Sequence, residues 1–72
     1  MNLQTLKDNK NDYIVIVARF GNIETISKPY TYRKEAVKMF NNLLNLSHYE
    51  DRNYKLWVQI IDEPLLKRLE VV

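Results

Sequence analysis

Apolar residues fall into short runs that predict three strands and one helix. The clearest run, residues 13–20, is rich in β-branched and aromatic side chains and is too short for a typical helix. Odd and even positions of this run are both apolar, which predicts a strand in the centre of the sheet. In residues 54–61, successive side chains would face opposite sides of a sheet, and this alternation predicts another strand. The strand ends at Asp62-Glu63-Pro64.

The single glycine, Gly21, follows the first run directly. Together with Asn22 it predicts a two-residue hairpin turn of the kind that requires positive φ. Lys28 and Pro29 end the second strand and are typical of an exposed sheet edge. The expected strand pairs are Phe20 with Ile23, Arg19 with Glu24, Ala18 with Thr25, Val17 with Ile26, and Ile16 with Ser27.

A helix is predicted for residues 32–46, with Thr31 as its N-cap. Its apolar stripe comprises Ala36, Phe40, Leu43 and Leu44. Residues 1–12 are predicted to form a flexible arm and residues 45–53 a polar loop. Residues 64–72 are a helical or extended tail that could pack on the sheet.

These elements predict an α+β domain over residues 13–63 with β-β-α-β order. The hairpin makes the first two strands antiparallel, and a right-handed crossover through the helix places the third strand on the other side of the first. We therefore expect a three-stranded antiparallel sheet of order 2-1-3, with the most apolar strand in the centre. One helix is expected to pack on one face of this sheet.

Composition narrows the class of protein. The chain has 72 residues, which is enough for one small domain. Eleven basic and nine acidic side chains are interspersed and give a net charge of +2, which is weak support for nucleic-acid binding. Because there is no cysteine and no apolar stretch of membrane-spanning length, we expect a cytoplasmic protein without disulfides or thiolate metal sites. The asparagine- and lysine-rich, glycine-poor composition resembles that of small bacterial or phage accessory proteins.

Residues that commonly perform chemistry are scarce. His48 is the only histidine, so no metal site can be completed around it. Ser27 and Ser47 are not in a nucleophile elbow, and one glycine cannot build a phosphate-binding loop. Two pairs of adjacent acidic residues are expected to point apart instead of converging in a pocket. We expect a non-enzymatic protein with no catalytic residue, cofactor, metal ion or small-molecule substrate.

The surface of most interest is the sheet face that a single helix leaves open. The helix is expected to cover the face formed by Ile14, Ile16, Ala18, Phe20, Ile23, Leu56, Val58 and Ile60. The other face would expose an apolar centre within a polar rim, as interfaces do. The predicted binding residues there are Trp57, Tyr13, Val15, Val17, Ile26, Arg19, Lys55 and Gln59. This face favours a protein partner, above all a second copy in a homodimer, unless the tail covers Trp57 and makes it part of the core.

Nucleic acid is the alternative partner for the same face. Arg19, Lys28 and Lys55 would contact phosphates or bases, while Trp57 and Tyr13 would stack on bases. Some integrase arm-binding domains and plant transcription-factor domains use a three-stranded sheet in this way, which is an analogy of layout without a shared motif. The apolar residues on this face and the small net charge weigh against nucleic acid.

Overall fold

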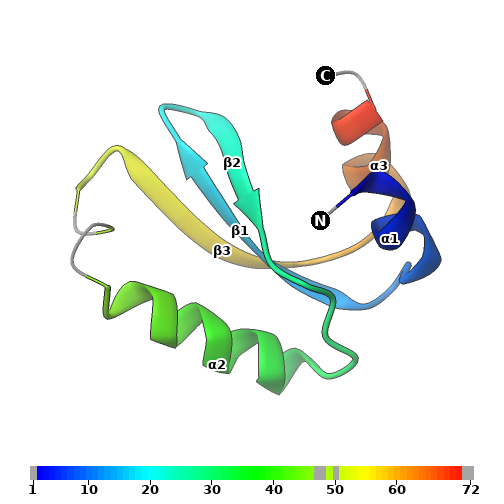
Figure 1. The fold of residues 1–72 in the computed structure, drawn as a ribbon, viewed down its shortest axis with the longest axis horizontal. Coiled ribbons are helices and arrows are strands. Elements are labelled where there is room, and N and C mark those ends of the chain that lie inside the picture. Colours follow the sequence, from blue (N-terminus) through cyan, green and yellow to red (C-terminus); the bar gives the residue numbers. More distant parts are fainter. Residues whose placement is uncertain (1, 47–48, 50, 71–72) are drawn as a thin grey trace.

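A computed structural model describes residues 2–46, 49 and 51–70 of the chain. Its helices and strands are α1 (Leu3–Asp8), β1 (Tyr13–Arg19), β2 (Asn22–Ile26), α2 (Arg33–Leu44), β3 (Tyr54–Ile60) and α3 (Glu63–Glu70). The strands form one antiparallel sheet in the order β2-β1-β3, which confirms the predicted α+β class and strand order (Figure 1). The structure adds α1, which was not predicted, and shows the tail as the helix α3, one of its two expected forms. These two helices lie side by side, away from α2 (Figure 1).

The pairing of β1 with β3 decides which side chains share a face. Ile16 is directly opposite Trp57, and Val17 is directly opposite Leu56. Residues that face each other across an antiparallel pair project from the same side of the sheet. The even-numbered residues of β1 therefore share a face with Trp57, and the odd-numbered residues share the other face with Leu56. Residues 14–18 are all buried, as expected for a central strand.

The helix α2 covers the odd-numbered face of β1, on which Val15 and Val17 lie, and it packs against β1 and β3. The predicted core face, which joined Ile14 and Ile16 to Leu56 and Val58, was therefore wrong. It assumed a different alignment of β3 with β1. The helix itself is slightly shorter than predicted, and Tyr32 occupies its N-cap without a side-chain hydrogen bond, so the predicted Thr31 cap was also wrong.

The even-numbered face of β1 is covered by α1 and α3. Its core cluster of buried side chains consists of Leu6, Ile14, Ile16, Ile61, Leu65 and Leu66. The predicted flexible arm over residues 1–12 thus contains a helix, which Asn2 caps by accepting from the Thr5 amide at 2.8 Å. Leu6 is 2% exposed, so burial of this side chain anchors the short helix to the domain.

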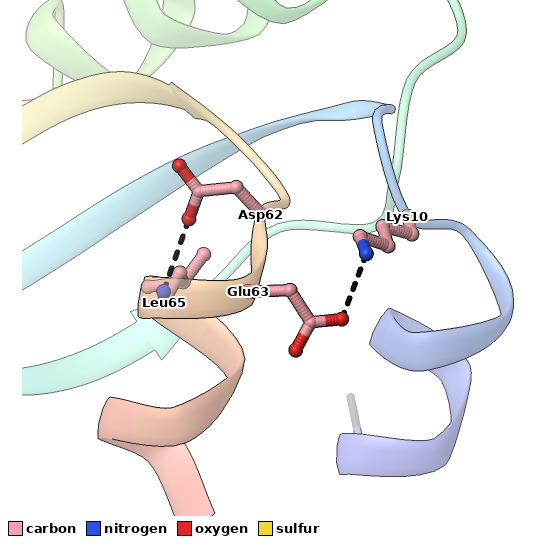
Figure 2. A network of polar contacts seen from close by, with 4 residues as sticks. All are labelled: Lys10, Asp62, Glu63 and Leu65. Atoms are coloured by element: carbon pink, nitrogen blue, oxygen red, sulfur yellow. Dashed lines mark hydrogen bonds and ion pairs between the residues drawn. The ribbon is translucent and has the colours of Figure 1, made fainter.

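The beginning of α3 is held by two adjacent carboxylates that point in different directions (Figure 2). Asp62 Oδ1 accepts from the Leu65 amide at 3.0 Å, which satisfies one free donor of the first helical turn. Glu63 reaches away from the helix to Lys10 Nζ at 2.7 Å, and this hydrogen bond with the lysine charge lowers the pKa of Glu63. Together they turn the chain out of β3 and place α3 beside α1.

The hairpin differs from its prediction by one residue. The turn residues are Phe20 and Gly21, with φ values of 51° and 80°, the positive values that a type I′ turn requires at both central positions. The pairs are Arg19 with Asn22, Ala18 with Ile23, Val17 with Thr25, and Ile16 with Ile26. Glu24 is thus an extra, bulged residue, and the predicted register was wrong. The bulge places Ile23 and Ile26 on the same face, where both pack against the core cluster.

We predict that Leu65→Ala lowers the free energy of unfolding by about 2–5 kcal/mol, because it leaves a cavity between α3 and the sheet. Leu65 is 2% exposed. Lys67→Ala, on the solvent side of the same helix, should change stability by no more than about 0.5 kcal/mol. Urea denaturation of both variants at one protein concentration measures the difference. Equal stability would show that α3 is not part of the core.

We predict that Phe20→Asn raises the free energy of unfolding by about 1 kcal/mol, because asparagine tolerates the left-handed backbone that phenylalanine resists. The Phe20 side chain is 65% exposed, so little burial is lost. Phe20→Ala is the matched control, since it removes the ring and keeps the unfavourable φ. Thermal melts should rank the asparagine variant above the alanine variant, and an equal melting temperature would contradict this account.

Candidate functional site

The structure divides the predicted binding face between the two sides of the sheet. Trp57, Lys55, Gln59 and Ile26 share the face of Ile14 and Ile16, whereas Tyr13, Val15, Val17 and Arg19 lie on the face of α2. The eight predicted residues therefore do not form one surface. For the β3 residues the error comes from the alignment of β3, since Trp57 was assigned to the side of Val17 but is opposite Ile16. Ile26 changes face because of the bulge in β2, which sets it opposite Ile16 instead of Val17.

Trp57 is partly buried at the margin of the core cluster beneath α1 and α3. Its indole Nε1 donates to Gln59 Oε1 at 2.8 Å, so its polar atom is satisfied within β3. Lys55, two residues before it, is exposed. An open apolar sheet centred on Trp57 is thus absent from the part of the chain that the structure describes.

The two edges of the sheet differ in how they are protected. Beside β2, the bulge at Glu24 and the following Lys28-Pro29 interrupt the regular row of backbone groups. Ser27 closes this end: its amide donates to the Val15 carbonyl at 2.9 Å and its Oγ accepts from the Val15 amide at 2.8 Å. Such features discourage further strands from pairing with β2.

The outer edge of β3 has no bulge and no proline, although it carries the exposed Lys55. It runs for seven residues without proline and pairs with β1 in an unbroken register. The Phe20 amide donates to the Asn53 carbonyl at 3.1 Å, and the Ile61 amide donates to the Asp12 carbonyl at 2.8 Å. Because hydrogen-bonded positions alternate along an antiparallel strand, the backbone groups that point away from β1 belong to Tyr54, Leu56, Val58 and Ile60.

Apolar side chains flank this open edge on the side of α2. Ile60 is 37% exposed and Leu44 is 48% exposed. Leu43 lines a groove between α2 and β2, and the next residue, Leu44, projects about 100° further around the helix, on the side away from β2. The Tyr54 amide of this row donates to the Asp51 carbonyl at 3.0 Å, whereas no such bond is found for the amides of Leu56, Val58 and Ile60 within the described residues. The β3 edge therefore combines these unpaired backbone groups with nearby exposed apolar surface.

Besides the β3 edge, the structure has a groove between α2 and β2, which the sequence did not predict. This apolar groove has a volume of about 270 Å³ and is lined by Val15, Val17, Thr25, Ser27, Lys28, Tyr30, Met39, Leu43 and Tyr49. It forms because α2 packs over β1 and β3, so the α2 face of β2 is left open. Leu43, a member of the predicted apolar stripe, and Met39 present the apolar surface of α2 toward this side.

Charges are distributed unevenly between the two sides of the molecule. Two ion pairs, each 2.7 Å long, are found among the described residues: Lys7–Glu70 joins α1 to α3, and Lys10–Glu63 joins the segment after α1 to the first residue of α3. Around α2 the cations instead lie over aromatic rings. Arg19 is 5.3 Å from the ring centroids of both Phe20 and Tyr54, Lys28 is 5.5 Å from that of Tyr30, and Lys34 is 5.8 Å from that of Tyr32.

The described residues offer little catalytic chemistry. Among them no group of three or more potential metal ligands comes together. Ser27 is engaged in the hydrogen bonds at the end of β2, while Ser47 and His48 lie outside the described residues. The helices that the structure describes include none that is long and apolar enough to cross a membrane. Comparisons with protein-family models, curated proteins and solved structures gave no significant match.

Proposed function

We propose that this protein is a small, non-enzymatic, cytoplasmic interaction module that associates with a second copy through the outer edge of β3. The observation that supports this most is the contrast between the two sheet edges. The β2 edge is interrupted by a bulge and is followed by proline, whereas β3 keeps an unbroken register with β1 and directs the backbone groups of Leu56, Val58 and Ile60 to the outside. An unprotected edge of this kind is a template for another strand.

The sequence of β3 is self-complementary about its central residue. Antiparallel pairing of β3 with itself across a twofold axis at Trp57 uses the whole strand. It sets Tyr54 opposite Ile60, Lys55 opposite Gln59, and Leu56 opposite Val58 of the second copy. Apolar residues thus meet apolar residues on the α2 face, and no like charges meet on the other face.

The twofold axis would also bring the two Trp57 side chains together. The Trp57 backbone groups point toward β1, so at the outer edge this residue forms a non-hydrogen-bonded pair, the closer of the two pair types. Close aromatic pairs stabilise sheets beyond their buried area. The dimer would contain a continuous six-stranded sheet, and Ile60 and Leu44 would lie near its new central seam, where burial of apolar surface favours association.

We predict that Gln59→Glu strengthens the dimer. The carboxylate introduced at position 59 of each copy would pair with Lys55 of the other copy. The two cross-strand ion pairs would each contribute roughly 0.2–1 kcal/mol, so the dissociation constant should fall about fivefold. The substituted side chain keeps an oxygen that accepts from Trp57 Nε1. Sedimentation equilibrium at low salt measures the constant.

The matched control combines Lys55→Glu with Gln59→Glu. This double variant sets like charges opposite each other at both positions and should weaken the dimer about fivefold relative to the unmodified protein, whereas Lys55→Glu alone should have little effect. A monomer at all accessible concentrations would overturn the proposal. Equal effects of Gln59→Glu alone and of the double variant would overturn the twofold axis at Trp57.

Single-stranded nucleic acid is a second candidate partner, favoured by the cation–aromatic pairs on the α2 side. Phe20 and Tyr32 are 65% and 62% exposed, and each has a cation over its ring. Exposed rings beside basic side chains are elements that stack bases and contact phosphates. Phe20 lies in the hairpin turn and Tyr32 near the opposite end of β1, so a bound strand would contact them at separate points. This surface retains the predicted Arg19 and Lys28, while Lys55 and Trp57 lie on the opposite face.

If nucleic acid is the partner, a labelled oligothymidylate of about 15 nucleotides should bind at low salt, with an affinity that falls steeply as salt is added. Substituting both Phe20 and Tyr32 by alanine should weaken binding, because each stacked base contributes about 1–3 kcal/mol. Fluorescence anisotropy provides the measurement. Absence of binding at low salt, or equal binding by the double alanine variant, would remove this candidate.

A further inference from the structure

The groove between α2 and β2 is separate from the β3 edge and offers a different kind of site. Val15 and Val17 of the central strand lie beneath it and are only 1% and 2% exposed, and Met39 and Leu43 of α2 form one wall. Its volume of about 270 Å³ is just below the range of roughly 300–1,000 Å³ that is typical of small-molecule sites. We propose that this groove binds a small amphiphilic carboxylate, with the apolar chain along the groove and the carboxylate at Lys28.

The chemistry of the lining selects an apolar body. Ser27 Oγ lines the groove, but it already accepts from the Val15 amide at 2.8 Å and donates to the Lys28 carbonyl at 3.0 Å. Val15, Val17, Met39 and Leu43 contribute only apolar side chains. A ligand that placed polar groups against these walls would lose hydrogen bonds to water without regaining them. An alkyl chain loses none and gains burial.

The charge at the mouth selects the head group. Lys28 is the one charged side chain among the residues that line the groove, and its Nζ lies 5.5 Å from the ring centroid of Tyr30. The ion pairs found in the described chain involve other lysines, so the Lys28 ammonium group has no carboxylate partner among them. A second, more polar hollow adjoins the groove at Tyr30 and Met39 and contains Lys38 and Glu35, whose charges offset each other. The described residues that line the two hollows therefore carry a net positive charge, which complements an anion.

The test compares three probes with the same alkyl chain and different head groups: decanoate, decanol and decylammonium, each below its critical micelle concentration. Two-dimensional amide spectra of the protein report binding through shifts of the groove residues. We expect decanoate to bind about two- to fivefold more tightly than decanol, because the binding free energy of a partly exposed ion pair with Lys28 corresponds to a change in affinity of this size. Decylammonium should bind less tightly than decanol.

Lys28→Glu should reverse this order, with decylammonium binding most tightly and decanoate least. Lys55→Glu is the matched control, since it makes the same charge change on the other face and should preserve the original order. Absence of groove shifts with all three probes would overturn the site. An order of affinities that Lys28→Glu leaves unchanged would overturn the assignment of a carboxylate to Lys28. Both outcomes are independent of dimer formation at β3, because the groove lies beside the opposite edge strand.

Discussion

The alignment of β3 with β1 is the constraint on which the rest of the structure depends. By setting Ile16 opposite Trp57, it decides that the even-numbered side chains of β1 meet α1 and α3, while Val15 and Val17 meet α2. A shift of one residue would exchange the two faces of β3. The side chain of Trp57 would then point toward α2, and the apolar side chains of β3 that α2 now covers would point toward α3. Both helical layers therefore rest on one register.

The bulge in β2 solves a related problem on the other side of β1. Ile23 and Ile26 are three positions apart, so a regular strand would direct them to opposite faces. The extra residue, Glu24, restores both to the side of α1 and α3, where they extend the core cluster. The same irregularity weakens β2 as a partner for other strands. Core formation at β2 and the contrast between the two sheet edges thus have one structural cause.

Local signals in the sequence identified the three strands and α2, but not the alignment of the strands and not α1. The uninterrupted apolar character of residues 14–18 identified the central strand, and Gly21 located the hairpin to within one residue. The turn was misplaced because Phe20 adopts a positive φ that phenylalanine normally avoids. No short turn links β1 to β3, so only the packing of three helices sets their register. The helix α1 has too few residues to be stable alone. It depends on burial of Leu6 in a core cluster whose other members include residues near the far end of the chain.

Because helices cover both faces of the sheet, the surfaces left for a partner lie at its edges, where side chains or backbone groups are not covered. A single α2 helix can contact two of the three strands closely, and it packs over β1 and β3. This placement leaves a groove at β2, and the sheet ends at an open row of backbone groups on β3. The two features require different partners, because one offers a cation beside an apolar lining and the other offers hydrogen bonds in a strand-like row. A dimer formed at β3 would keep both grooves at the outer ends of the six-stranded sheet, so ligand binding and self-association are sterically compatible within one small domain.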